Sequence, residues 1–189
     1  MSYWIQADAL IGANGISPWS EDLDKIEQVA EQNPDLSKFT LRPTLLWFSI
    51  PGGHTTLFGI GSLSSFALTL GWIPIASAIF SYFTYLSLMV VGGPFLSFQW
   101  DILLLETLLL SLPFLPMVRV HRLGSKIYFS HWSRLLVVAL LAKLMLESGI
   151  VKFTSFAGDG TNTWRELTAL DYHYWTQPLP HGLSKWIHT

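Results

Sequence analysis

The chain has 189 residues, of which 50% are hydrophobic and only 13% are charged, well below the roughly 25% that is usual in soluble domains. No Asp, Glu, Lys or Arg occurs between Arg42 and Asp101, a stretch far longer than the roughly 20 residues that cross a bilayer. These features exclude an ordinary soluble domain and indicate a membrane protein. The formal net charge of -2 argues against nucleic-acid binding, and the lack of cysteine excludes disulfides and thiolate metal sites.

The first segment, residues 1–42, is polar. It lacks the basic start and uninterrupted apolar run of a signal peptide. Residues 13–18, Ala-Asn-Gly-Ile-Ser-Pro, predict a turn that leads into a helix. From Ser20 to about Gln32, apolar residues recur every three positions among acidic ones. This pattern predicts an amphipathic helix that lies on the membrane surface.

The second segment, residues 43–153, is a predicted bundle of membrane-spanning helices. Its apolar stretch is too long for a single crossing, and the sequence Gly71-Trp72-Ile73-Pro74 predicts the first break. A second break is predicted at Gly92-Gly93-Pro94. The expected fold is therefore an all-α polytopic membrane protein with interfacial amphipathic helices and about four transmembrane helices, near residues 55–71, 74–91, 98–118 and 133–153.

The last segment, residues 154–189, is polar and aromatic, and it has too few consecutive apolar residues to cross a bilayer. The loop between the third and fourth predicted spans contains four basic residues and no acidic ones: Arg119, Arg122, Lys126 and Arg134. The positive-inside rule places this loop in the cytoplasm. Residues 1–42 and 154–189 are then expected together on the lumenal or periplasmic side.

Five charged residues fall inside the third and fourth predicted spans: Asp101, Glu106, Lys143, Glu147 and Lys152. A charge near the bilayer centre costs at least about 2.5 to 3.5 kcal/mol, so each of these residues needs a partner or water. Similar depths in the membrane predict a network of Glu106, Lys143 and Glu147, with Asp101 near Lys152. Such a network either fixes how two helices pair or acts on a substrate, and the sequence leaves both possibilities open.

Other kinds of site find little support in the sequence. The spacing of His173, His181 and His188 matches no metal-binding motif, so no metal is expected. No serine occurs in a G-x-S-x-G context, and Gly59-Ile60-Gly61 lacks the surroundings of a dinucleotide site. We expect these glycines to let helices approach closely, and we expect no cofactor.

Several sequence motifs are more specific than the composition of the chain. They are Leu-Ile-Gly-Ala-Asn-Gly-Ile-Ser-Pro at residues 10–18, Pro-Thr-Leu-Leu-Trp at 43–47, Phe-Gln-Trp-Asp-Ile-Leu-Leu-Leu-Glu at 98–106, Ser-Gly-Ile-Val-Lys-Phe at 148–153, and Trp-Arg-Glu-Leu-Thr-Ala-Leu-Asp-Tyr-His-Tyr-Trp-Thr-Gln-Pro-Leu-Pro at 164–180. With these motifs the chain resembles the lipase maturation factor family of polytopic membrane proteins. Members of that family are longer, so the chain is expected to be a fragment or a shortened member.

The resemblance implies a protein of the endoplasmic reticulum membrane, or of the cytoplasmic membrane in a bacterium, that helps exported client proteins such as lipases to fold. The family is also distantly similar to the membrane part of the vitamin K-dependent carboxylase. That likeness supplies an enzyme alternative, with Lys152 or His173 as base beside Asp101 and Glu106. A third alternative is a structural membrane protein without a client.

Under the leading hypothesis the tail binds the client without catalysis. The residues expected to do so are Trp164, Arg165, Thr168, Asp171, Tyr172, His173, Gln177 and Pro178. Trp164, Thr168, Tyr172 and Trp175 also recur at helical spacing, which predicts an aromatic helix face that Pro178 would end. A plain membrane anchor is the competing interpretation, but it does not require the Arg, Asp, His and Gln among these rings.

Overall fold

The computed structural model describes residues 2–33, 35–121, 131–154 and 161–171. The chain forms two compact units, Met1–Arg134 and Leu135–Thr189. The described residues contain no strand, only one isolated antiparallel bridge between Trp72 and Val120. The helices are α1 (Ser2–Ile11), α2 (Trp19–Gln32), α3 (Lys38–Leu41), η1 (Leu45–Phe48), α4 (Gly53–Thr69), α5 (Pro74–Gly92), η2 (Gly93–Phe95), α6 (Gln99–Ser111), η3 (Leu112–Phe114) and α7 (His131–Thr154).

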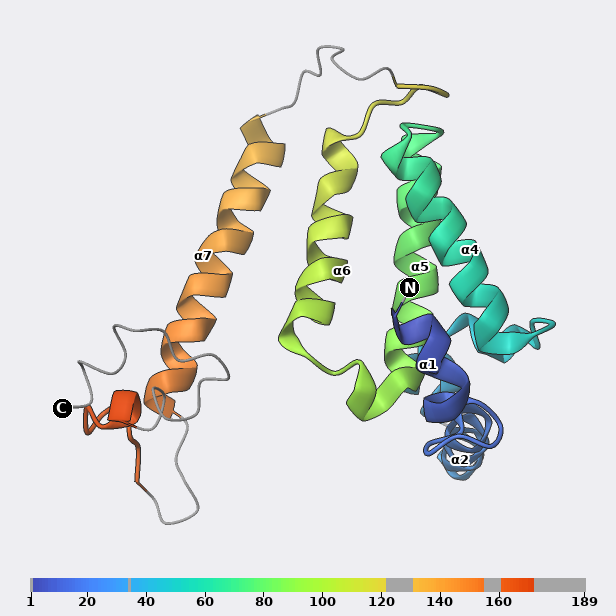
Figure 1. Cartoon of the computed structure of the whole chain (residues 1–189), viewed down its shortest axis with the longest axis horizontal. Helices are drawn as coiled ribbons and strands as arrows, with labels where there is room; N and C mark the ends of the chain where they lie inside the picture. Colours follow the sequence, from blue (N-terminus) through green and yellow to red (C-terminus); the bar gives the residue numbers. More distant parts are fainter. Residues whose placement is uncertain (1, 34, 122–130, 155–160, 172–189) are drawn as a thin grey trace. The chain divides into compact units, whose positions relative to one another are not determined.

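Helix α1 was not predicted from the sequence. Its residues Ala7 and Ile11 are four positions apart and therefore lie on one face, where they are 1% and 0% exposed. They join a core that also contains Leu23 of α2, Leu46 of η1, Leu57 of α4, Leu88 and Val91 of α5, and Leu96. Figure 1 shows α1 and α2 beside the end of the α4–α5 pair where α4 begins and α5 ends. This core therefore closes one end of the helix pair.

The amphipathic helix predicted from Ser20 to Gln32 is confirmed as α2, which begins at Trp19 directly after Pro18. Its Leu23 is buried in the core, so at least this part of its apolar face packs against protein. Two ion pairs connect α2 to the segment that follows it: Arg42 Nε lies 3.0 Å from Asp22 Oδ2, and Lys38 Nζ lies 2.6 Å from Glu27 Oε1. The expectation that α2 rests on a membrane surface stays a prediction.

Helices α4 and α5 form an antiparallel hairpin that breaks where the sequence predicted. Gly71 has a φ of +73°, a left-handed conformation that glycine adopts without strain. A side chain at this position would also lie only 2.6 Å from the carbonyl oxygen of His121. The His121 N–H donates to the Gly71 carbonyl at 2.8 Å, and the Ile73 N–H donates to Arg119 at 2.7 Å. The segment after α6 therefore holds the turn between α4 and α5.

Helix α6 begins as predicted but ends at Ser111 instead of Val118. Proline lacks an N–H, and its ring collides with the carbonyl one turn earlier, so Pro113 and Pro116 stop the helix. The chain tightens into the 3-10 turn η3 at this point. With 13 residues, α6 is roughly 20 Å long at about 1.5 Å per residue, less than the roughly 30 Å hydrocarbon core of a bilayer.

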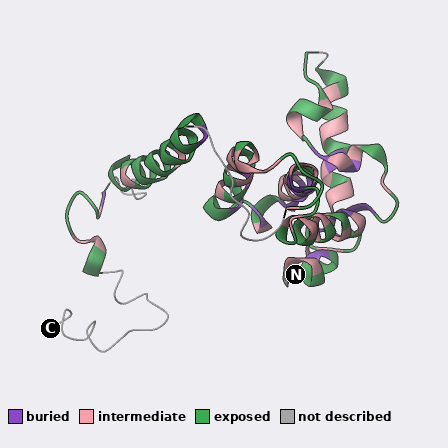
Figure 2. Cartoon of the chain, turned by 90° about the horizontal axis from the view of Figure 1, so that it is seen from above, coloured by how far each residue is buried: buried purple, intermediate pink, exposed green. Residues whose placement is uncertain are grey.

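In the second unit, most residues of α7 are exposed, as Figure 2 shows along the helix. Exposed Leu141, Met145 and Val151 give it apolar surface, while Lys143, Glu147 and Lys152 supply charges. After α7, the Asn162 Oδ1 accepts the N–H groups of Trp164 and Arg165 at 3.0 and 3.1 Å. This side chain therefore begins the turn over residues 163–167.

By length and composition, one stretch of the described residues, Pro74–Phe95, qualifies as a membrane span, with a mean hydropathy of 1.7. Helices α4 and α6 are shorter, with 17 and 13 residues. Helix α7 has 24 residues but includes Arg134 in addition to the three charges named above. The all-helical class is confirmed for the described residues, and four crossings remain a proposal.

Candidate functional site

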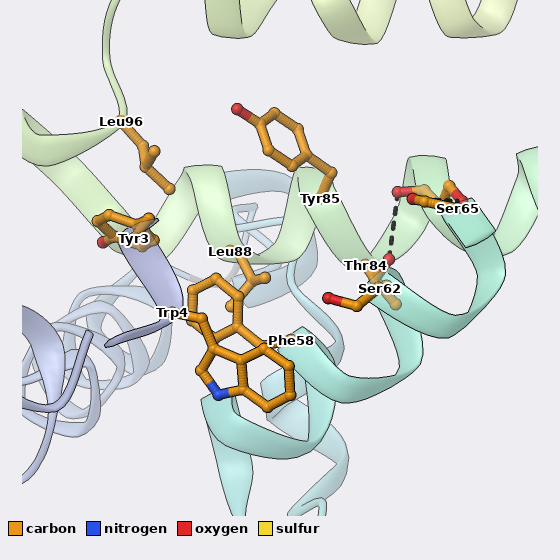
Figure 3. A pocket seen from close by; sticks show the side chains of 11 residues that line it. Tyr3, Trp4, Phe58, Ser62, Ser65, Thr84, Tyr85, Leu88 and Leu96 are labelled. Atoms are coloured by element: carbon orange, nitrogen blue, oxygen red, sulfur yellow. Dashed lines mark hydrogen bonds between the residues drawn. The ribbon is translucent and has the colours of Figure 1, made fainter. Parts of the chain in front are cut away.

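A cavity of about 320 Å³ lies in the first unit, among α1, α4 and α5. Figure 3 shows rings along one part of its wall, where Tyr3 and Trp4 come from α1 and Phe58 comes from α4. Trp4 and Phe58 stack with their ring centroids 6.1 Å apart and an interplanar angle of 9°. Four hydroxyl side chains line another part of the cavity wall: Ser62, Ser65, Ser81 and Thr84. Among the residues that the structure describes, none with a charged side chain lines it.

Most of these hydroxyls bond to one another or to their own helix. The Ser81 hydroxyl lies 3.2 Å from that of Ser65 and donates to Ser64 at 3.1 Å. The Thr84 hydroxyl lies 2.7 Å from the Phe80 carbonyl and 3.1 Å from the Ser81 carbonyl. Because the Ser65, Ser81 and Thr84 hydroxyls already have hydrogen-bond partners, they need few bonds to water, and an apolar group can lie against this part of the wall.

Asp101 is buried at the start of α6, with 3% of its surface exposed. The Tyr85 hydroxyl donates to its Oδ1 at 2.5 Å, and the Phe98 N–H donates to its Oδ2 at 3.2 Å. The carboxylate thus ties α6 to α5 and caps its own helix. The predicted pairing of Asp101 with Lys152 would join the two units and stays a prediction.

Tyr3 stands beside this carboxylate on the cavity wall. Burial, and after it the negative charge of Asp101, raises the pKa of the Tyr3 hydroxyl above its usual value, so the group stays protonated at neutral pH. Its oxygen is buried and has no hydrogen-bond partner among the described residues. A buried donor without an acceptor costs about 1 to 3 kcal/mol. This oxygen is closed off from water-sized molecules, so the Tyr3 ring and not its hydroxyl forms part of the cavity wall.

A second polar cluster, Asp8–His54–Trp19, was missed by the sequence analysis. His54 is 8% exposed, and its Nε2 lies 2.8 Å from Asp8 Oδ1. The Trp19 indole, which can only donate, lies 3.1 Å from His54 Nδ1. Nδ1 must therefore accept and Nε2 must carry the proton, so the bonds select one neutral tautomer of His54. This cluster fastens α1 and the start of α2 to α4.

One pair of the predicted charge network lies within α7, where Lys143 Nζ and Glu147 Oε1 are 3.9 Å apart. This pair confirms that the two residues share a helix face. Lys152 places its Nζ 4.7 Å from the ring centroid of Trp164, a cation–π contact. Glu106 is half-buried on α6. Its predicted pairing with Lys143 stays a prediction because it joins the two units.

Four of the predicted client-binding residues lie in the described segment 161–171, where Trp164, Arg165 and Asp171 are exposed and Thr168 is half-buried. The prediction of one helix through Trp164 and Thr168 is wrong. Leu167 has a φ of +62°, a left-handed conformation that interrupts a helix between them. The Thr168 N–H instead closes the turn by donating to Thr163 at 2.9 Å.

The remaining predicted tail residues, Tyr172, His173, Gln177 and Pro178, lie outside the described residues, as does Trp175 of the predicted aromatic face. Among the described residues, no three His, Asp or Glu side chains come together in an arrangement that would hold a metal ion.

Comparisons with known proteins cover the whole chain. A family model described as the lipase maturation factor transmembrane domain matches residues 1–189. Lipase maturation factor 1 of Homo sapiens is 30% identical over 97% of this chain and 32% of its own length. Lipase maturation factor 2 of Xenopus tropicalis is 36% identical over the full chain and 27% of its own length. The chain therefore spans about a third or less of these relatives. No solved structure matches it significantly.

Proposed function

The chain belongs to the lipase maturation factor family, and from that premise we propose that it is the membrane-embedded part of a factor that helps secreted lipases to fold. The observation that carries the proposal is the match of the family model over residues 1–189. The names of the relatives denote maturation of lipases, so the proposed activity is binding to a folding client rather than catalysis.

The proposed topology has four crossings, formed by α4, α5, α6 with η3, and α7. It is supported by the basic connection between α6 and α7, which contains Arg119, Arg122 and Lys126 and no acidic residue, and by Arg134 in the first turn of α7. With this connection in the cytoplasm, α1, α2 and the segment after α7 lie on the opposite side. In a eukaryotic cell that side is the lumen of the endoplasmic reticulum, where secreted lipases fold.

The proposed client site is the segment after α7. Exposed Trp164 and Arg165 lie in the turn that Asn162 begins, and exposed Asp171 follows a few residues later, so this short segment offers an aromatic ring and both signs of charge. Lys152 stacks on Trp164 and thereby ties the turn to the end of α7. Sequence extends the proposed site to Tyr172, His173, Gln177 and Pro178. A surface that combines rings with hydrogen-bonding groups suits a protein partner.

The five charges of α6 and α7 are proposed as a clasp between helices. Asp101 already receives two donors, and Lys143 already pairs with Glu147. We propose that Glu106 completes the network with Lys143, because the sequence places the two residues at similar depths in the membrane and their charges are opposite.

A cell-based maturation assay tests the proposed client site. The chain, joined to the segments that complete a full-length lipase maturation factor, is expressed in cells that lack their own factor, and secreted lipase activity is measured. We expect Arg165→Gln with Asp171→Asn, and separately Tyr172→Phe with His173→Gln, to reduce that activity at least about fivefold, the effect of losing roughly 1 kcal/mol of binding.

The matched control is Glu166→Gln, an exposed residue of the same turn that is not proposed to contact the client. It should leave lipase activity unchanged, and all variants should insert and accumulate as the parent does. Full activity in both double variants would show that the segment is only a membrane anchor. An equal loss in Glu166→Gln would show that the turn, and not the named groups, matters.

A further inference from the structure

Three aromatic rings gather in the segment between α2 and α4 and form an exposed patch. The ring centroid of Phe39 on α3 lies 5.9 Å from that of Phe48 and 6.4 Å from that of Trp47, both on η1. Phe39 and Phe48 nevertheless stay 47% and 67% exposed. We call these three residues the α3–η1 patch. Large exposed rings that contact one another indicate a surface that meets a partner.

Two hydrogen bonds fix the depth of this patch along α5. The Leu45 N–H donates to Ser87 Oγ at 3.0 Å, and the Thr44 hydroxyl donates to the Ser87 carbonyl at 3.3 Å. Helix α5 has 19 residues and is therefore about 28 Å long, close to the roughly 30 Å hydrocarbon core of a bilayer. Ser87 lies about 7 Å inside the end of α5 at Gly92. Where α5 crosses the membrane, η1 thus begins near the boundary between hydrocarbon and head groups.

The backbone of this segment is prepared for a place with little water. Besides the Leu45 N–H, the Leu46 N–H donates to Thr44 Oγ1 at 3.3 Å and the Ser49 N–H donates to the Leu46 carbonyl at 3.2 Å. The Trp47 indole donates to the Arg42 carbonyl at 2.8 Å, so its polar group is also occupied. Irregular backbone at membrane depth needs such internal partners.

The charges beside the patch are already neutralised. Lys38 Nζ lies 2.6 Å from Glu27 Oε1, and Arg42 Nε lies 3.0 Å from Asp22 Oδ2. A paired cation attracts anionic head groups much less than a lone one. The contact that the patch makes is therefore expected to come from its rings and not from its basic residues.

We propose that the α3–η1 patch is a membrane contact, in which the rings of Phe39 and Phe48 insert among the upper acyl chains of one phospholipid leaflet. That leaflet lies at the end of the hairpin where α4 begins and where α1 and α2 pack (Figure 1). The two ion pairs to α2 then hold this helix at the membrane surface as well. The inference rests on a membrane crossing by α5, and neither the orientation of the chain nor a client enters it.

Spin labels on single cysteines test the proposal, since the natural chain contains no cysteine. Phe39→Cys and Phe48→Cys are labelled separately with a nitroxide, and the whole chain is reconstituted in phosphatidylcholine vesicles. Electron paramagnetic resonance then measures how often each label collides with oxygen, which concentrates in hydrocarbon, and with a nickel chelate, which stays in water. Thermal unfolding shows whether each variant keeps its fold, and the second position serves if the first does not.

Two reference positions calibrate the measurement. Ile16→Cys is the matched control, an apolar residue that is 77% exposed in the turn between α1 and α2 and lies outside the patch. Phe83→Cys marks the interior of the span, because Phe83 is 49% exposed near the middle of α5. The chelate should reach positions 39 and 48 at least about tenfold less often than position 16, which corresponds to about 1.4 kcal/mol of transfer free energy for a polar molecule.

Oxygen should reach positions 39 and 48 nearly as often as position 83, and vesicles that also contain phosphatidylglycerol should give the same result. Chelate collisions as frequent as at position 16 would overturn the proposal, because the rings would lie in water. Protection from both reagents would also overturn it and would show that protein covers the patch, either a client segment or a second copy. Protection that requires phosphatidylglycerol would show that basic residues, and not the rings, make the contact.

The proposed client site stands or falls separately. Loss of lipase maturation in the tail variants with unchanged collision rates at positions 39 and 48 would leave both proposals standing. Full maturation activity in those variants would remove the client site and leave the membrane contact. Free access of the chelate to position 83 would show that α5 does not cross the membrane, and would overturn this inference together with the proposed topology.

Discussion

The α4–α5 hairpin and α7 both carry polar side chains in otherwise apolar helices, but the polar groups and their partners differ. The hairpin uses hydroxyls, and Ser65, Ser81 and Thr84 find their partners on the same helix or on the one beside it. Helix α7 uses charges, and the described partners of Lys143 and Lys152 are Glu147 one turn away and the Trp164 ring.

The difference shows which polar groups depend on contacts with other helices and which do not. A hydroxyl that bonds to a carbonyl of its own helix is satisfied before any tertiary contact forms. An exposed ion pair one turn apart contributes only a few tenths of a kcal/mol, which is small against the cost of charge in a bilayer. We therefore expect the charges of α7 to depend on the rest of the bundle more than the hydroxyls of the hairpin do.

The largest effect should come from separating the proposed pair Glu106 and Lys143. Glu106→Leu should lower the free energy of unfolding by about 3 to 5 kcal/mol, because it removes one partner of the proposed charge pair in an apolar setting. The double variant with Lys143→Leu should recover much of that loss. Chemical unfolding of the four proteins in a double-mutant cycle measures the coupling. Equal losses in the single and double variants would show that the residues are not partners.

A smaller but still large effect is expected at Asp101. Asp101→Ala removes the acceptor of the Tyr85 hydroxyl and the cap on Phe98, and should cost about 3 kcal/mol of unfolding free energy. Asp101→Asn keeps an acceptor oxygen and should cost less. The matched control is Thr107→Val on the same helix, where the exposed hydroxyl bonds only to the Leu103 carbonyl. A loss no greater than that control would contradict the role of Asp101.

The sequence predicted the parts of the fold that depend on local chemistry. Gly71 and Pro74 mark the turn between α4 and α5, and Gly92 and Gly93 mark the end of α5, because backbone conformation at these positions is decided by the residue itself. The same reasoning failed for α1, where polar residues such as Asp8 hid two core positions. Asp8 bonds to His54 on α4, and a partner this far along the chain leaves no periodic signal.

The candidate site was less predictable than the fold. The charges of α6 and α7 stand out in an apolar sequence, but the identity of their partners depends on how helices pack. No sequence pattern indicated the cavity, because its wall combines rings from α1 with hydroxyls from α4 and α5, which are distant in the sequence. In the tail, helical spacing suggested one helix, whereas Leu167 adopts a left-handed conformation that the pattern does not encode.

Close approach within the hairpin predicts a moderate effect at Gly61. A Cβ there would lie 3.0 Å from the Thr84 hydroxyl, whereas a Cβ at Gly59 would meet nothing within 4 Å. The expected role of these glycines in close helix contact is thus confirmed at Gly61 and wrong at Gly59. Gly61→Ala should destabilise the hairpin by about 1 kcal/mol, with recovery when Thr84→Ala is added. Gly59→Ala should be neutral or stabilising in the same thermal unfolding measurement.

The smallest effect is expected for the hydroxyls themselves. Thr84→Val keeps the shape and removes bonds that stay within α5, so it should lower the free energy of unfolding by only about 0.6 kcal/mol. Chemical unfolding of Thr84→Val and Asp101→Ala under the same conditions compares the two losses of unfolding free energy directly. A loss as large as that of Asp101→Ala would contradict the view that hydroxyls of the hairpin are satisfied locally.

The most direct test of the account is the topology on which the proposed client site depends. Reporters fused after Lys126 and after Thr161 should lie on opposite sides of the membrane, the first in the cytoplasm and the second in the lumen or periplasm, because α7 crosses between them. Reporters on the same side would contradict the crossing by α7. The reverse arrangement would place the proposed client site away from the compartment in which secreted lipases fold.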